Sequence, residues 1–187
     1  TVSSPDGNIK VEINLNKGIT YDVYCGDELV LDDCRLALDV DGNVLGSSPK
    51  LAKAVRKAID EVKTPFLKLK YNEVKNHCNE LTLKFKGDYS VVFRAYDDGV
   101  AYRFITAFPG DVNVNHEDIT VIFPEETDLI LQQSESYVTS YEEKYTKHTT
   151  HNWKSHDNIV HMPVLAVTPS GTNVLVSESD LVDYPAA

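Results

Sequence analysis

Apolar and polar residues alternate with a period of two along much of this chain, which is typical of β-strands that bury one face. The run 10–15 alternates strictly, and short sequences rich in Gly, Asn and Asp separate it from the runs that follow. The predicted strands are 10–15, 19–25, 28–31, 35–40, 67–75, 79–86, 89–96, 100–106, 119–123, 164–168 and 173–177. Many short strands at regular spacing predict a mostly β protein, an antiparallel β-sandwich that forms a single domain over residues 1–187.

Three turns support hairpins. Residues 89–96 and 100–106 meet at Asp98-Gly99, a dipeptide that can supply the positive φ angles of a two-residue turn. Asp41-Gly42 predicts a second turn of this type, and Pro169-Ser170-Gly171 predicts a final hairpin between 164–168 and 173–177. The segment 125–162 is polar and rich in Tyr and His, so we predict a long region dominated by loops.

Charge and composition limit the classes of partner. The chain has 187 residues, 42% of them hydrophobic, and a net charge of −11. This content fits a globular domain, and the charge repels nucleic acid and anionic membrane surfaces but not a neutral sugar. No apolar run has the length of a membrane-spanning helix. Three scattered cysteines are too few for a disulfide framework.

Residues that could carry chemistry include four pairs of adjacent carboxylates, Asp32/Asp33, Asp97/Asp98, Glu125/Glu126 and Glu142/Glu143. Adjacent carboxylates favour solvated turns, because neighbouring strand residues face opposite ways and cannot flank a sugar. The segment 39–43 is explained by a hairpin turn, since its Gly stands at the wrong place for an EF-hand. Four histidines surround Trp153 without the spacing of a known metal motif; they are His148, His151, His156 and His161. A polar loop is the simpler interpretation, and the alternative is a carbohydrate-binding loop in which Tyr141, Tyr145 and Trp153 stack on sugar rings.

Several segments, in order, resemble the N-terminal β-sandwich domain of glycoside hydrolase family 97. They are Ser4-Pro5-Asp6-Gly7-Asn8-Ile9-Lys10-Val11, Asn76-His77-Cys78-Asn79-Glu80-Leu81-Thr82, the hairpin 93–104, Tyr141-Glu142-Glu143-Lys144-Tyr145, Ser177-Glu178-Ser179-Asp180-Leu181 and Asp183-Tyr184-Pro185. Cys78 stands where the family pattern has Tyr. The resemblance implies that this domain is a supersandwich like that of galactose mutarotase. It also implies that the sandwich continues beyond residue 187 and forms the first part of a larger enzyme.

The resemblance also implies a function. The parent enzyme would be exported to the periplasm or cell surface and would cleave α-glucosidic or α-galactosidic bonds in oligosaccharides. Its catalytic carboxylates would lie in a following (β/α)8 barrel, so this chain would have no catalytic residue and no activity alone. The sandwich would pack on the barrel and contribute Glu178 as one ligand of an active-site calcium ion, which one carboxylate alone cannot hold.

Two questions stay open at this stage. Residues 47–63 have a helical pattern, with Pro49 at a first-turn position and one apolar face, whereas the resemblance implies extended chain near 58–63. We favour irregular or extended structure, with one helical turn at most, because local propensity is a weak prior. Functionally, the alternatives are an independent carbohydrate-binding module and, less favoured, a mutarotase-like epimerase. An epimerase would need a His acid and a carboxylate base, for which the candidate pairs are His77 with Glu80 and His161 with Glu178.

Overall fold

The computed structural model describes residues 1–153 and 159–179. The chain divides into two compact units, Thr1–Val121 and Ile122–Ala187, and each is described here by itself. Every regular element in the described residues is a β-strand, and adjacent strands run antiparallel. No helix in the described part of the chain could cross a membrane. The predicted antiparallel β-sandwich is confirmed, whereas the single domain over 1–187 stays a prediction.

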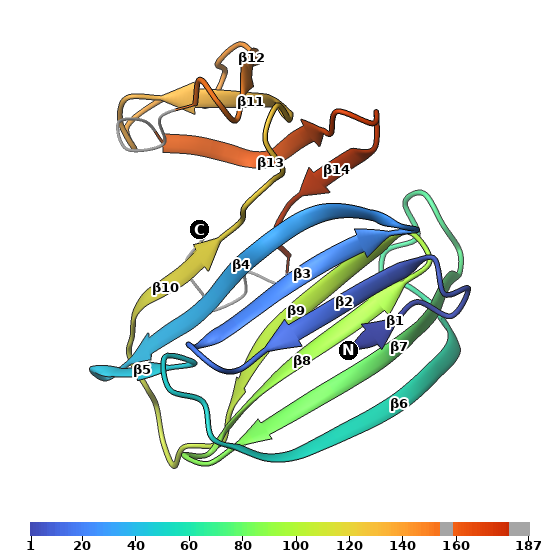
Figure 1. Cartoon of the computed structure of the whole chain (residues 1–187), viewed down its shortest axis with the longest axis vertical. Helices are drawn as coiled ribbons and strands as arrows, with labels where there is room; N and C mark the ends of the chain where they lie inside the picture. Colours follow the sequence, from blue (N-terminus) through green and yellow to red (C-terminus); the bar gives the residue numbers. More distant parts are fainter. Residues whose placement is uncertain (154–158, 180–187) are drawn as a thin grey trace. The chain divides into compact units, whose positions relative to one another are not determined.

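The first unit consists of two sheets. One has the order β1-β2-β3-β4-β10, with β5 paired to β4, and the other has the order β6-β7-β8-β9 (Figure 1). The strands of the first sheet are β1 (Val2–Ser3), β2 (Ile9–Asn14), β3 (Ile19–Cys25), β4 (Glu28–Val40), β5 (Asn43–Leu45) and β10 (Val114–Thr120). Those of the second are β6 (Leu51–Lys63), β7 (Val74–Phe85), β8 (Tyr89–Tyr96) and β9 (Gly99–Thr106).

The two sheets of this unit enclose an apolar core. The ring of Tyr21 on β3 meets the ring of Phe93 on β8 edge to face, with centroids 5.8 Å apart, and lies 6.2 Å from the ring of Tyr102 on β9. Such edge-on contacts are favourable between aromatic rings. Asn79 on β7 also joins the sheets, because its Nδ2 donates to the Ser3 carbonyl oxygen of β1 at 2.9 Å. Fully buried side chains from both sheets complete the core, including Val11, Ile19, Leu36, Leu81 and Val91.

The observed strand β4 differs from the sequence prediction for residues 28–40. The runs 28–31 and 35–40 were expected as two short strands, but they form one strand of 13 residues. Asp33 interrupts the pattern with a φ of 47°, and the register against β3 shifts near this point. The Asp33 N–H donates to the Asp22 carboxylate at 2.7 Å. A bulge of this kind lets a strand continue through a local irregularity that reads as a break in sequence.

The hairpin of β8 and β9 is confirmed, but its turn is not where we predicted it. Tyr96 pairs with Gly99, so Asp97 and Asp98 form the two-residue turn and Gly99 begins β9. The φ of Gly99 lies outside the left-handed region. The register that places Phe93 opposite Tyr102 fixes the loop, and this core pairing overrides the preference of glycine for the turn. Asp41-Gly42 forms the predicted turn between β4 and β5, with φ angles of 50° and 84°.

The segment 47–63 is resolved in favour of extended chain. Residues 51–63 form β6, which pairs with β7 along its whole length, and no helical turn is present in these residues. Two other predictions are wrong in part. Residues 67–73 lie outside any strand, since β7 begins at Val74, and β10 ends at Thr120 instead of reaching residue 123.

The second unit contains one four-stranded sheet of order β12-β11-β13-β14. Its strands are β11 (Asp128–Ser134), β12 (Thr146–Thr149), β13 (Ile159–Val167) and β14 (Asn173–Val176). Leu129, Leu131 and Ala166 form its buried centre. The predicted final hairpin is confirmed by β13 and β14. The prediction of a loop-dominated 125–162 holds for 135–145 but is wrong for β11, β12 and the start of β13.

Candidate functional site

The aromatic and histidine residues expected to bind sugar lie on and beside the sheet of the second unit. His148 is on β12 and His161 is on β13, while the loop 135–145 connects β11 to β12. This loop is tied to the sheet, because Gln132 Nε2 on β11 donates to the Glu143 carbonyl oxygen at 2.5 Å. The antiparallel pairing of β11 with both neighbours therefore brings two distant histidines and the loop onto one sheet.

Tyr141 contacts His161. The two rings have centroids 5.1 Å apart, and the Tyr141 hydroxyl donates to the Tyr137 carbonyl oxygen at 3.2 Å. His161 Nε2 lies 3.0 Å from the Ser134 hydroxyl. Tyr141 has a φ of 58°, and 62% of its surface is exposed. One part of the ring thus packs on an imidazole while much of the side chain stays available to a ligand.

Trp153, which the sequence suggested as a sugar-stacking residue, packs partly into the core of the second unit. It is half-buried and packs against the cluster of Leu129, Leu131 and Ala166. Its ring meets that of His148 edge to face, with centroids 5.0 Å apart. His148 Nε2 lies 2.8 Å from Gln133 Nε2 and 2.9 Å from the Thr146 hydroxyl. The indole therefore holds His148 against the sheet, and its capacity for stacking on a sugar is reduced.

An open depression of about 420 Å³ adjoins these residues. Its lining side chains are mostly polar and offer both donors and acceptors to hydroxyl groups. They are Gln133, Glu142, Glu143, Lys144, Thr146 and His148. Tyr145 belongs to the same loop and is 58% exposed. The sequence pattern Tyr-Glu-Glu-Lys-Tyr thus supplies part of a polar depression with an exposed aromatic residue in the same loop.

The histidine cluster does not form a metal centre in the described residues, which contain no group of three or more His, Cys, Asp or Glu that could hold an ion. His156 lies outside the described residues. The segment 39–43 is a turn, as predicted: Asp39 Oδ1 accepts from the Gly42 N–H at 2.9 Å and from Asn115 Nδ2 at 3.2 Å. The Asp39 carboxylate oxygen is therefore engaged in holding this turn.

Glu178 follows the last strand of the second unit by two residues. It is half-buried, and its carbonyl oxygen accepts from the Ser177 hydroxyl at 3.4 Å. Its position after β14 presents a carboxylate at the end of an ordered sheet. The remainder of the predicted segment, residues 180–185, lies outside the described residues.

The second sheet of the first unit holds an ion pair that the sequence did not predict. Arg94 Nε donates to Glu80 Oε2 at 2.8 Å, and this contact raises the pKa of the Arg94 guanidinium. Glu80 also lines an open depression of about 370 Å³ on this sheet, together with residues such as Thr82, Ser90 and Arg103. The sequence could have indicated this ion pair only through the register of the β7–β8 hairpin, which places Glu80 opposite Arg94.

This arrangement also contradicts one of the two catalytic pairs expected for an epimerase. His77 and Glu80 are three residues apart on β7 and so face opposite sides of the sheet. His77 Nδ1 lies 3.6 Å from the Asp97 carboxylate, while Glu80 pairs with Arg94. In the other proposed pair, His161 contacts Ser134 and Tyr141.

Comparison with known proteins adds to this geometry. The sequence pattern of the family described as "Glycosyl-hydrolase 97 N-terminal" matches residues 2–187. A curated relative, a retaining alpha-galactosidase of Bacteroides thetaiotaomicron, is 33% identical over 196 residues, which cover 99% of this chain and 29% of that protein. This chain therefore spans less than a third of the length of the curated relative that it matches.

Solved structures share the fold. A glycoside hydrolase family 97 enzyme from Pseudoalteromonas sp. strain K8, solved in complex with acarbose, has a TM-score of 0.83 at 23% identity, covering all of this chain and 29% of that one. A beta-arabinopyranosidase has a TM-score of 0.84 at 24% identity, covering 96% of this chain and 31% of that one. At these identities the likeness establishes the fold.

Proposed function

This chain belongs to the Glycosyl-hydrolase 97 N-terminal family, and from that premise we propose that it is the non-catalytic sandwich of an exported enzyme that hydrolyses α-galactosidic or α-glucosidic bonds. The proposed locations are the periplasm and the cell surface. The observation that carries the proposal is the 33% identity to a retaining alpha-galactosidase over almost the whole chain. That identity favours α-galactosides, because the solved neighbours at 23–24% identity support the fold alone.

The catalytic carboxylates belong, in this proposal, to a following (β/α)8 barrel on which the sandwich packs. This chain matches only 29% of the length of the curated relative, so most of that relative lies outside the match and leaves room for a barrel of this kind. Two carboxyl groups must flank a glycosidic bond at about 5–9.5 Å. Carboxylates that are adjacent in sequence do not meet this requirement by themselves, and Asp97 accepts a hydrogen bond from the Asp6 N–H at 3.0 Å.

Glu178 is the residue that we propose to reach the active site of the parent enzyme. A half-buried carboxylate that follows an ordered strand fits the oxygen donor that calcium prefers. One carboxylate is insufficient, so the other ligands would come from the barrel. When bound, calcium supplies a fixed positive charge beside the sugar. The contribution of this chain would be to fix the Glu178 carboxylate through the β13–β14 hairpin and to close one side of the pocket.

The test is Glu178→Gln in the full-length parent enzyme, with Glu125→Gln as the control at an exposed carboxylate of the same unit. The substitution keeps the size of the side chain and removes its charge. We expect at least tenfold weaker calcium binding by isothermal titration calorimetry and lower turnover of nitrophenyl α-galactoside, a loss on the order of 1.4 kcal/mol. Calcium affinity and turnover equal to those of the Glu125→Gln control would refute the assignment.

An independent carbohydrate-binding role is the second candidate. The exposed Tyr141 and Tyr145 and the polar depression beside them favour it. Aromatic side chains that stay accessible next to hydrogen-bonding groups are the usual composition of a small-molecule site. This role is compatible with the first, because an oligosaccharide substrate could contact both the sandwich and the barrel of the parent enzyme.

A further inference from the structure

The loop between β6 and β7, residues 64–73, exposes more apolar surface than a solvated loop requires. We call this segment the tip loop. Phe66 is 100% exposed and Leu69 is 87% exposed. Leu67 and Tyr71 of the same loop are 66% and 67% exposed. Single exposed apolar residues are ordinary, but four large ones within six residues mark a surface that a partner covers.

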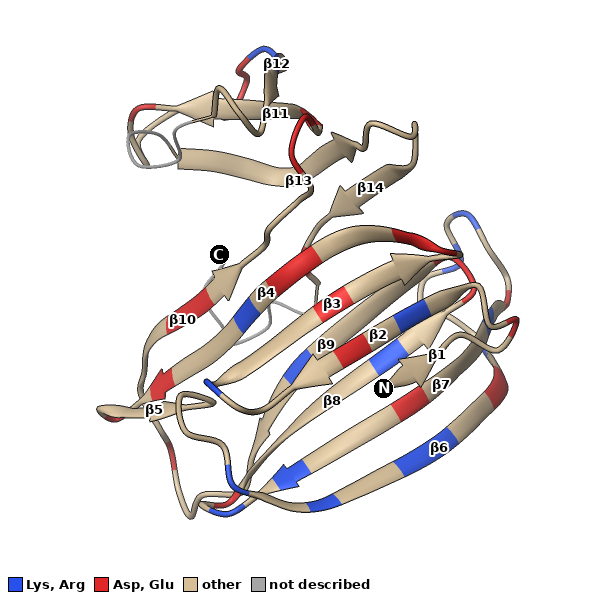
Figure 2. Cartoon of the chain, in the orientation of Figure 1, with Lys and Arg blue, Asp and Glu red and all other residues tan. Residues whose placement is uncertain are grey.

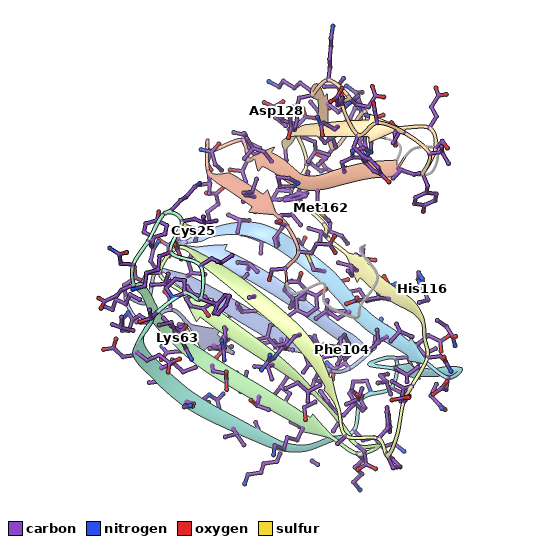
Figure 3. All side chains as sticks on the ribbon, turned by 180° about the vertical axis from the view of Figure 1, so that it is seen from behind. Cys25, Lys63, Phe104, His116, Asp128 and Met162 are labelled. Carbon is purple, nitrogen blue, oxygen red and sulfur yellow. The ribbon has the colours of Figure 1, made fainter. Side chains whose placement is uncertain are left out.

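The tip loop starts from a firmly paired base. The ladder between β6 and β7 is continuous from Lys53 paired with Lys84 to Lys63 paired with Val74, where the loop begins and ends. Figure 1 shows the loop at the end of these two strands, and Figure 3 marks Lys63 at its start. The exposed side chains are therefore carried on a fixed base in the first unit. Val62 and Val74 extend the apolar surface onto that base, with exposures of 62% and 43%.

The charge of this region is opposite to that of the chain. Residues 63–75 contain four lysines and one carboxylate, Glu73, whereas the whole chain has a net charge of −11. Lys63, at the base of the loop, pairs with Glu61 at 3.0 Å, so Lys68 and Lys70 carry the positive charge of the loop itself. The lysines are Lys63, Lys68, Lys70 and Lys75. Figure 2 shows blue segments on β6 and on the loop that follows it. A basic rim around apolar side chains is complementary to an acidic surface with an apolar depression.

We propose that the tip loop is the contact through which this domain docks on the catalytic barrel of its own polypeptide. The inference rests on the proposed function and identifies the surface that it requires. The match to 29% of the curated relative supports a large domain beyond this one. Leu67, Leu69 and Tyr71 alternate in sequence with Lys68 and Lys70, so the tip loop offers exposed apolar side chains and positive charges together. The apolar side chains enter a depression on the barrel, and the lysines meet carboxylates at its rim.

Hydrogen exchange in the full-length enzyme tests this contact. The backbone hydrogen bond that the structure shows within the tip loop runs from the Leu69 N–H to the Leu67 carbonyl oxygen at 3.1 Å. An exposed loop of this kind exchanges quickly. We expect the amides of residues 66–71 to exchange at least tenfold more slowly than unstructured amides. The variant Phe66→Ser/Leu69→Ser should lose this protection, whereas Val44→Ser, which alters an exposed apolar side chain of β5, should keep it.

The contribution of the tip-loop lysines is tested separately with a pair of charge-reversal variants. Lys68→Glu/Lys70→Glu should reduce protection at low salt, and Lys17→Glu/Lys50→Glu, which changes the net charge equally at other exposed sites, should not. Protection that rises with protein concentration over roughly a hundredfold range would assign the surface to a second copy and overturn the proposal. Protection that requires anionic phospholipid vesicles would overturn it in favour of a membrane. Free exchange of residues 66–71 in a parent whose turnover falls on Glu178→Gln would overturn this inference alone and leave the proposed function standing.

Discussion

Gly46 should tolerate alanine far less well than Gly42, although both have similar backbone angles and flank the short strand β5. The φ angles are 88° and 84°. A β-carbon at Gly46 would lie 2.8 Å from the Leu36 carbonyl oxygen, a backbone atom of β4 that cannot rotate away. At Gly42 nothing lies within 4 Å of the added carbon. The pair therefore separates the cost of steric overlap from the cost of the left-handed conformation.

The magnitudes follow from these two contributions. The left-handed conformation costs an alanine about 1–2 kcal/mol at either position. The overlap at Gly46 adds the cost of forcing atoms into packed structure, about 1–3 kcal/mol. The overlap also displaces a connection between strands, because the Gly46 carbonyl oxygen accepts from the Ile19 N–H at 2.9 Å. We expect Gly46→Ala to lower the free energy of unfolding by about 2–5 kcal/mol, and Gly42→Ala by about 1–2 kcal/mol.

Urea denaturation followed by circular dichroism measures the difference. The midpoint concentration should fall in both variants and should fall further for Gly46→Ala, with the slope of the transition unchanged. In thermal unfolding, each kcal/mol corresponds to roughly 2–4 °C for a chain of this size. Equal losses in the two variants would refute the reasoning, since they would show that the loop after β5 moves away from Leu36 at no cost.

Two further predictions concern the buried Tyr21 and the loop 135–145. Burial, with smaller contributions from Cys34 and Tyr102, raises the pKa of the Tyr21 hydroxyl above its ordinary value of 10.0. Stability should therefore be full below about pH 10 and fall above it, by up to about 1.4 kcal/mol per pH unit, and Tyr21→Phe should flatten this fall in urea titrations. If the second unit binds glycans, Tyr145→Ala should weaken retardation in affinity gels containing galactan or starch without changing the melting temperature, whereas Trp153→Ala should lower the melting temperature; the reverse pattern would refute these assignments.

Strands whose partner is their neighbour in sequence were predicted most closely. The bounds of β3 and β8 agree with the predicted runs 19–25 and 89–96, because alternation and adjacent turns are local signals. The turn after β8 was misplaced by one residue, because the facing of Phe93 and Tyr102 sets the register and no local signal reports it. The helical pattern in 47–63 produced no helix for a related reason, since the pairing of β6 with β7 outweighs local propensity, and the extended alternative that we favoured is the one observed.

The candidate site was located by sequence in region but not in detail. The segment around Tyr141 and Trp153 was identified by its composition, yet the half-buried position of Trp153 depends on packing against Leu129, Leu131 and Ala166. That packing follows from the pairing of β11 with β12 and β13. The sequence analysis predicted a loop-dominated region over 125–162 and therefore did not anticipate these strands. The role of Glu178 came from the resemblance to a family and stays a prediction.

The failed strand prediction at 67–75 is consistent with the docking surface proposed for the tip loop. Alternation of apolar and charged residues reports that one side of an extended segment is buried, but it does not report what buries it. In this chain Leu69 is 87% exposed, and residues 67–73 lie outside any strand. The pattern and the structure agree if the burying surface lies in another part of the parent polypeptide. The same reasoning explains why the second sheet of the first unit ends in a loop with four exposed large apolar side chains, since contact with water accounts for the lysines of this loop but not for its apolar residues.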